Sequence, residues 1–240
     1  MKTWFTLVLI LAVSFVRAAE TPPATLLGAW ESGGDGPKRI HLTTENYWVQ
    51  AIYDPAQKQF LRTFGGTYAV KGDIATGRIE FDSGDATQVG VDFQVTITSD
   101  GKKLTIVQEN GTAEDWRRID DGNAPLAGVW RISERKVDDG MRAMPLQARR
   151  TLKILTATRF QWVAINVETG EFSGTGGGTY TLKDGKYVEK IEFFSRDASR
   201  VGAELSFEAE VGADRWVHRG KSSKGDPIHE VWTRFAASKP

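Results

Sequence analysis

Apolar and polar residues alternate along most of the chain with a period of two, which is the pattern of half-buried strands. Leu205, Phe207 and Ala209, for example, alternate with polar residues, and residues 91–97 repeat the pattern. Each half of the chain contains eight such runs, separated by turn residues such as those at 54–55 and 184–185. Short strands and tight turns throughout predict an all-β protein.

The chain also contains an internal repeat. A shift of 112 residues superimposes residues 65–68 (Gly-Gly-Thr-Tyr) on residues 177–180, and residues 79–81 (Ile-Glu-Phe) on residues 191–193. Two matched blocks at one constant offset indicate a tandem duplication.

The two copies span residues 25–119 and 126–235, because an opening Gly-x-Trp and a closing Trp recur at matching places. Eight short strands joined by tight turns suit an up-and-down barrel, which leaves no exposed sheet edge. The sequence therefore predicts two tandem eight-stranded antiparallel up-and-down barrels. The second copy has gained about a dozen residues, around 138–150, after its first strand. They form either a lid over the barrel mouth or a plain surface excursion.

Each copy opens with Gly-x-Trp, at Trp30 and Trp130, and ends with an arginine on its last strand, Arg118 or Arg234. This pairing resembles the lipocalin (calycin) signature. The body of the second copy resembles the uncharacterised lipocalin-like domains of secreted Bacteroidetes proteins. The resemblance implies a small ligand-holding barrel whose floor is closed by the arginine packing across the tryptophan, and it carries no assigned activity.

The first 19 residues have the layout of a secretory signal peptide. Lys2 precedes an apolar stretch at 5–13, and small residues at Ala18 and Ala19 suit cleavage. We therefore expect a periplasmic or secreted protein. Because no second long apolar run follows, we expect no integral membrane segment after removal of the signal.

Composition narrows the function classes further. The chain has no cysteine, so each barrel must be held by packing rather than by disulfides. Its 31 basic and 31 acidic residues cancel, which gives no indication of a nucleic-acid partner. No metal-ligand spacing and no phosphate-binding loop occur, so no cofactor is predicted. The oligomeric state stays open.

The duplication indicates which polar side chains point inward. Ile79 and Phe81 define the apolar, interior face of their strand in the first copy, and Ile191 and Phe193 are expected to do so in the second. By the same alternation, Tyr187, Glu189 and His218 lie inside the second barrel. Their counterparts in the first copy are an alanine, a glycine and an isoleucine, so the fold does not need them.

Polar groups that converge in an aromatic cavity are typical of a small-molecule site. We therefore expect the second barrel to bind a small, partly apolar ligand, while the first barrel has the more ordinary core. The candidate ligand-binding residues are Tyr180, Tyr187, Glu189, His218, Glu230, Arg234, Trp130, Trp162, Phe193, Trp216 and Trp232.

Three alternatives remain open for these residues. Glu230 could pair with Arg234, and Glu189 with His218 or Tyr187, in a purely structural network. His218 and Glu189 could instead act as an acid–base pair in a barrel-hosted isomerase, cyclase or hydrolase, although binding without turnover is favoured. The third alternative is an interaction module with filled barrels. His41 and His229 are predicted to face solvent.

Overall fold

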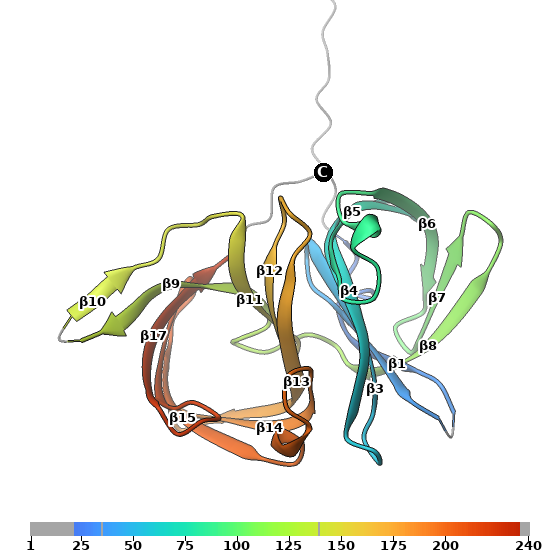
Figure 1. Ribbon diagram of the computed structural model, residues 1–240. Coiled ribbons are helices and arrows are strands. Elements are labelled where there is room, and N and C mark those ends of the chain that lie inside the picture. The colour runs from blue at the N-terminus through green and yellow to red at the C-terminus, as the bar shows by residue number, and fades with distance from the viewer. Residues whose placement is uncertain (1–21, 35, 139, 236–240) are drawn as a thin grey trace, which may run out of the picture.

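The structure, a computed structural model, describes residues 22–34, 36–138 and 140–235. It consists of two antiparallel β-barrels that lie side by side (Figure 1). The predicted fold class, two tandem eight-stranded antiparallel up-and-down barrels, is confirmed. The expected signal segment, residues 1–19, lies outside the described residues.

In the first barrel each strand pairs with its neighbour in the chain, and the last strand pairs with the first. Alternate turns therefore lie at opposite ends of the barrel. A short 3-10 helix, η1 (Ala86–Gln88), joins the fifth strand to the sixth. The strands are β1 (Gly28–Ser32), β2 (Lys38–Thr43), β3 (Tyr47–Asp54), β4 (Gln59–Lys71), β5 (Ile74–Asp82), β6 (Asp92–Ser99), β7 (Lys103–Gln108) and β8 (Ala113–Asp120).

The second barrel closes through the pairing of its first strand, β9 (Gly128–Val137), with its last. Its other strands are β11 (Arg149–Leu155), β12 (Arg159–Asn166), β13 (Phe172–Lys183), β14 (Lys186–Phe194), β15 (Glu204–Val211), β16 (Arg215–Lys221) and β17 (Pro227–Arg234), and the 3-10 helix η2 (Ala198–Arg200) precedes β15.

The inserted segment of the second copy forms a hairpin. The outer half of β9 pairs with an extra strand, β10 (Gly140–Ala143), and this hairpin projects from the barrel (Figure 1). Met141, Met144 and Leu146 in or after β10 are exposed. The segment is thus an excursion of the sheet.

A β-bulge at the same place in both copies changes which side chains face inward. The register shifts between Gly65 and Gly66 in the first barrel, and between Gly177 and Gly178 in the second. A Cβ atom on Gly66 or Gly178 would collide with a backbone carbonyl of the neighbouring strand, so this close approach requires glycine.

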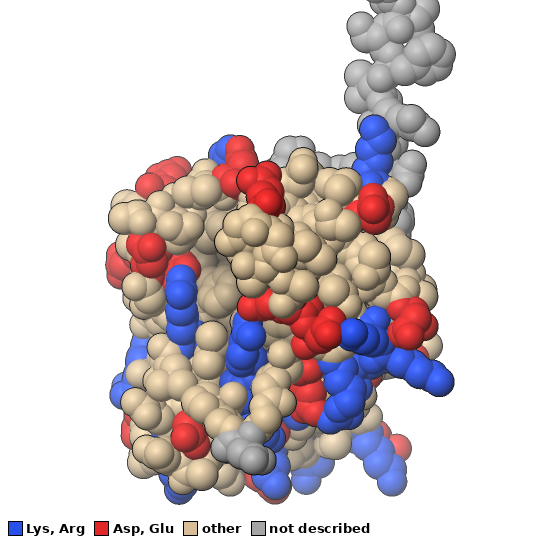
Figure 2. All heavy atoms as spheres, turned by 90° about the vertical axis from the view of Figure 1, so that its right-hand side faces the viewer, with Lys and Arg blue, Asp and Glu red and all other residues tan. Residues whose placement is uncertain are grey.

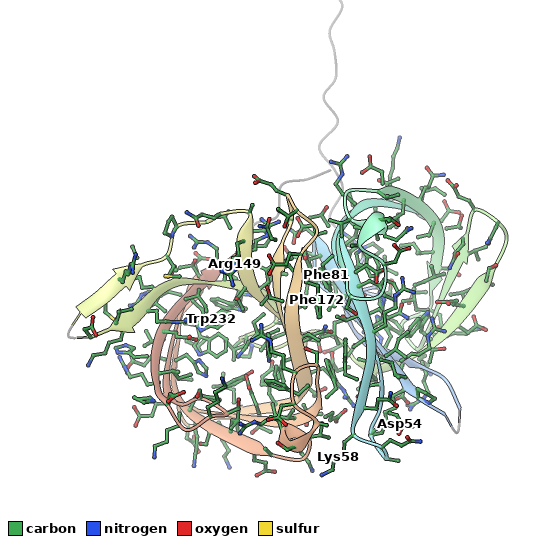
Figure 3. The ribbon with its side chains drawn as sticks, viewed as in Figure 1. Asp54, Lys58, Phe81, Arg149, Phe172 and Trp232 are labelled. Carbon is green, nitrogen blue, oxygen red and sulfur yellow. The ribbon has the colours of Figure 1, made fainter. Side chains whose placement is uncertain are left out.

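The bulge corrects two predictions. Phe81 and Phe193 were expected inside the barrels, and both pack instead in the apolar layer between the barrels. Figure 3 shows Phe81 and Phe172 in this position. One extra residue in a strand reverses the inward–outward alternation beyond it, and the period-two pattern of the sequence does not reveal where that happens.

The layer between the barrels combines apolar packing with hydrogen bonds between polar side chains. The ring of Tyr53 lies 4.7 Å from that of Phe193, and its hydroxyl donates a 2.5 Å hydrogen bond to Glu192. Near the centre, the amide of Gln161 donates hydrogen bonds to Thr63 Oγ1 at 2.7 Å and Thr175 Oγ1 at 3.0 Å. These two threonines are equivalent positions of the two copies, so the barrels pack through equivalent faces, as subunits of a two-fold dimer do.

Both barrel floors have the arrangement that the family resemblance implied. The guanidinium carbon of Arg118 lies 4.2 Å from the ring centre of Trp30, and that of Arg234 lies 4.1 Å from Trp130. Each tryptophan indole donates a hydrogen bond to a backbone carbonyl four residues earlier. These contacts close one end of each barrel.

Candidate functional site

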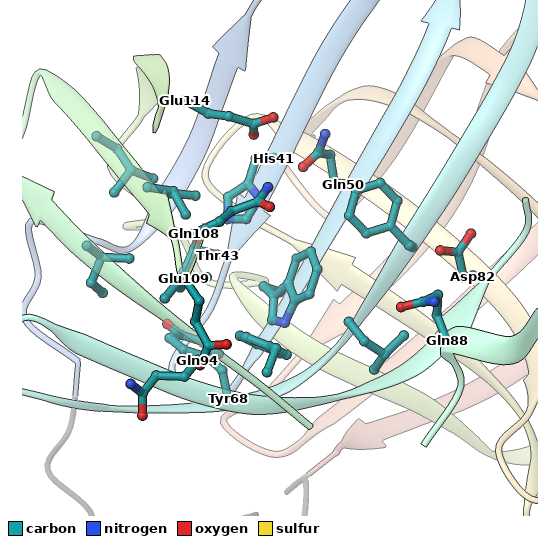
Figure 4. A pocket seen from close by; sticks show the side chains of 18 of the residues that line it. His41, Thr43, Gln50, Tyr68, Asp82, Gln88, Gln94, Gln108, Glu109 and Glu114 are labelled. Atoms are coloured by element: carbon teal, nitrogen blue, oxygen red, sulfur yellow. The ribbon is translucent and has the colours of Figure 1, made fainter. Parts of the chain in front are cut away.

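A cavity of about 800 Å³ lies inside the first barrel. It extends from Leu26 and Tyr68 near the floor to Gln88 of η1 and to Glu109 and Asn110 in the turn after β7 (Figure 4). This volume falls within the range of small-molecule sites. The sequence comparison had favoured the second barrel, so the location of the cavity differs from that expectation.

One wall of the cavity carries four polar side chains from β2 and β3. In the ladder between these strands His41 lies opposite Gln50, and Thr43 lies opposite Trp48. Four of their atoms are buried and have no hydrogen-bond partner among the described residues, namely His41 Nδ1, Thr43 Oγ1, Trp48 Nε1 and Gln50 Nε2. We call these four residues the β2–β3 quartet. Because buried polar groups are almost always paired, the quartet is available to a molecule in the cavity.

The placement of His41 corrects a prediction, since this residue was expected to face solvent. It is 7% exposed, and its ring stacks on that of Trp48 with centres 5.7 Å apart. Burial, with a smaller contribution from the nearby Arg39 charge, lowers the pKa of His41 to about 4. The imidazole is therefore neutral at neutral pH, and its Nδ1 can take part in hydrogen bonds without a buried charge.

Both arginines that line the cavity are paired with carboxylates. Arg39 contacts Glu114 at 2.7 Å and lies 5.0 Å from the ring centre of Trp116. Arg62 contacts Asp82 at 2.5 Å. Acidic and basic side chains also lie close together on the outer face of this barrel, which faces the viewer in Figure 2.

The interior of the second barrel is occupied by an ion pair inside a ring of aromatic side chains. Lys153 Nζ lies 2.6 Å from Glu189 Oε1, and both side chains are about 95% buried, with 6% and 5% exposed. The ammonium lies between 5.1 and 5.7 Å from the ring centres of Phe160, Tyr187, Trp216 and Trp232. Such distances allow cation–π attraction, which strengthens in a desolvated site.

A second ion pair, between Glu230 and Arg135, lies next to His218. Glu230 pairs with Arg135 at 2.8 Å, and His218 Nδ1 lies 3.7 Å from Glu230 Oε2. Burial, with Lys153 nearby, lowers the pKa of His218 in spite of the two carboxylates close to it. Burial alone would raise the pKa of Glu230, but His218 and Arg135 lower it below its ordinary value. Glu230 thus pairs with Arg135, and Glu189 with Lys153, rather than with the partners that the sequence suggested.

The other predicted site residues occupy several places. Tyr180 donates a 2.7 Å hydrogen bond to the carbonyl of Thr156, and Arg234 and Trp130 form the floor. Trp162 is partly buried near the second barrel's interior and contacts Phe194. Phe193 lies between the barrels. Tyr187, Glu189, His218, Glu230, Trp216 and Trp232 come together inside the second barrel, where Tyr187 Oη, Trp216 Nε1 and both nitrogens of His218 have no hydrogen-bond partner among the described residues.

The sequence comparison missed Lys153 and the quartet for one reason. The apolar faces of β2 and β11 pack in the layer between the barrels, so the polar side chains that alternate with them face the barrel interiors. The ladder places Trp30 opposite His41 and Trp130 opposite Lys153, so these two are equivalent interior residues. The available signal in the sequence was a polar residue next to an apolar one at the same place in both copies. His41 follows Ile40, and Lys153 follows Leu152.

Within the described ranges there is no group of three or more His, Cys, Asp or Glu residues that could hold a metal ion. In the same part of the chain no helix is both long and apolar enough to cross a membrane.

Comparison with known proteins finds a family of unknown function and a solved structure of a lipocalin-like protein. Residues 125–240, a little under half of the chain, match a family described as Domain of unknown function (DUF4488). A solved structure of a lipocalin-like protein from Bacteroides uniformis is 14% identical over 47% of this chain and all of its own, with a TM-score of 0.34. No curated protein matches the chain. Any function must therefore be argued from the site itself.

Proposed function

We propose that the protein binds a small, partly apolar molecule inside the first barrel. A closed eight-stranded barrel is wide enough to hold one such ligand. The observation that carries the proposal is the coincidence of a cavity of about 800 Å³ with the unpaired polar atoms of the β2–β3 quartet. Without a ligand or ordered water these atoms would stay buried and unsatisfied, which is unfavourable.

Export to the periplasm or outside the cell is part of the proposal, since it rests on the signal-like residues 1–19 alone.

The second barrel is the alternative binding site. The unpaired atoms of Tyr187, Trp216 and His218 favour it, because they are buried and lie close together. Against it stands the occupation of the barrel centre by Lys153 and the surrounding rings. An acid–base role for His218 and Glu189 is less favoured, because the Glu189 carboxylate is already bound to an ammonium.

A neutral fluorescent probe distinguishes the two barrels. N-phenyl-1-naphthylamine fluoresces when it enters an apolar cavity, and it can be titrated into the mature protein. The test variant is Gln50→Trp, which places a bulky ring in the first cavity. The matched control is His218→Ile, which gives the second barrel the residue found at the equivalent place in the first.

We expect binding to be lost in Gln50→Trp and kept in His218→Ile. The reverse result would move the site to the second barrel. Absence of any probe binding by the wild-type protein would overturn the proposal of a ligand-binding barrel.

A further inference from the structure

The first cavity has two unlike walls. In an eight-stranded barrel with strands in chain order, β2 and β3 lie diametrically opposite β6 and β7. The first pair carries the quartet. The second pair contributes mostly apolar side chains, namely Phe93, Val95, Ile97, Leu104 and Ile106, together with the polar Asp92, Gln94 and Gln108. A molecule between these walls meets the hydrogen-bonding groups of the quartet on one side and mainly hydrocarbon on the other.

The chemistry of the quartet favours oxygen atoms on the ligand. The indole of Trp48 and the amide nitrogen of Gln50 only donate hydrogen bonds, while the hydroxyl of Thr43 can donate or accept. The neutral imidazole of His41 completes the set. From strand geometry the four positions form an array of about 7 Å along the strands and about 5 Å across them. Several oxygens spread along one face of a ligand match such an array better than one terminal polar group.

The charges around the cavity disfavour an anion. Both guanidiniums that line it, those of Arg39 and Arg62, already contact carboxylates. Its lining otherwise contains no lysine or arginine, whereas it contains five carboxylates, Asp82, Asp85, Asp92, Glu109 and Glu114. A carboxylate buried there would lose its hydration without gaining a free cation.

We propose that the ligand is an uncharged facial amphiphile, a rigid or semi-rigid apolar molecule with hydroxyl or carbonyl oxygens along one face. The β2–β3 quartet binds that face, and the β6–β7 wall binds the apolar one. This inference rests on the proposed binding function and specifies the class of ligand.

Matched steroid esters test the inference. Methyl cholate carries three hydroxyls on one face of an apolar ring system, and methyl lithocholate carries a single hydroxyl. Both can be measured by their displacement of N-phenyl-1-naphthylamine from the wild-type protein and from the double variant Thr43→Val, Gln50→Leu. These substitutions remove two polar groups and keep most of the side-chain volume.

The decisive quantity is the ratio of the two affinities. We expect the preference for methyl cholate over methyl lithocholate to fall by about tenfold or more in the double variant, since two hydrogen-bonding groups that face the ligand are removed. We also expect the free cholate anion to bind the wild-type protein at least about tenfold more weakly than its ester.

Each other outcome has a distinct meaning. An unchanged ratio, or tighter binding of the anion, would overturn the facial-amphiphile inference while leaving a ligand-binding barrel in place. If the probe itself fails to bind, the proposed function fails. The probe titration of the double variant shows whether the variant still has a folded cavity.

Discussion

The two barrels share one backbone plan and differ in what occupies their centres. The first holds a cavity lined by polar side chains without partners, and the second holds a buried ion pair enclosed by aromatic rings. The four quartet positions show the difference most clearly. His41, Thr43, Trp48 and Gln50 of the first barrel correspond to Lys153, Leu155, Phe160 and Trp162 of the second.

Two positions on the opposite wall carry larger side chains in the second barrel. Leu104 and Val95 of the first barrel correspond to Trp216 and Phe207 of the second, so larger rings reach toward the centre. The smaller side chains at these two positions leave more space in the first barrel than in the second. Of the polar residues gained by the second copy, Glu189 pairs with Lys153, whereas Tyr187 and His218 have no hydrogen-bond partner among the described residues.

The largest expected effect concerns the ion pair of the second barrel. Lys153→Met leaves the Glu189 carboxylate buried without its partner, which lowers the free energy of unfolding by about 3–5 kcal/mol. Chemical denaturation measures this loss. In the double variant Lys153→Met, Glu189→Leu no charge remains to be buried, and most of the stability returns. A double variant as unstable as the single one would contradict this account of the second barrel.

The pH dependence of stability tests the buried state of His41. The unfolded chain takes up a proton on histidine near pH 6.5, but the folded protein does so on His41 only near pH 4. The unfolded state therefore binds more protons in this window, and the free energy of unfolding falls by about 3 kcal/mol as the pH decreases through it.

His218 in the second barrel acts in the same direction, because burial lowers its pKa as well. His41→Gln and His218→Ile should each remove part of the slope between these pH values. The measurement is the change in the denaturation midpoint between pH 7 and pH 4. If this change is the same in His41→Gln and in the wild-type protein, His41 is not buried in the neutral form.

Making the first barrel more like the second should stabilise it. Gln50→Trp introduces the residue found at the equivalent place in the second barrel and fills part of the cavity, with a gain of about 0.5–2 kcal/mol. Thermal unfolding reports the change. A loss of similar size would contradict this prediction and would mean that the cavity is too narrow for the ring.

The smallest effect is expected in the β9–β10 hairpin, which only the second barrel has. Met144 is 38% exposed, so Met144→Ser should change the free energy of unfolding by no more than about 0.5 kcal/mol. A loss of several kcal/mol would indicate that the hairpin packs against another part of the molecule.

Much of the fold follows from the sequence. The period-two alternation and the 112-residue repeat indicate two barrels, and the family resemblance carried by Trp30 and Arg118 implies the closed floor. Phe81 and Phe193 could not be placed, because a one-residue bulge reverses their side of the sheet. A single-sequence pattern contains no signal for such a bulge beyond the paired glycines.

The candidate site was harder to predict. Tyr187, Glu189 and His218 are buried inside the second barrel, as their apolar or small counterparts suggested. Their partners, Lys153 and Arg135, come from strands far away in the sequence, so pairing could not be read from local patterns. Whether a cavity is empty depends on the summed volume of all interior side chains, which requires the three-dimensional arrangement.

Fluorine NMR tests the central claim, ligand binding in the first barrel, most directly. The protein is labelled with 5-fluorotryptophan, and the signals of Trp48 and Trp216 are assigned from the spectra of Trp48→Phe and Trp216→Phe. Trp48 lines the first cavity, while Trp216 contacts Lys153 in the second barrel. Addition of N-phenyl-1-naphthylamine should shift the Trp48 signal and leave that of Trp216 in place. A shift of Trp216 with no change at Trp48 would contradict the account.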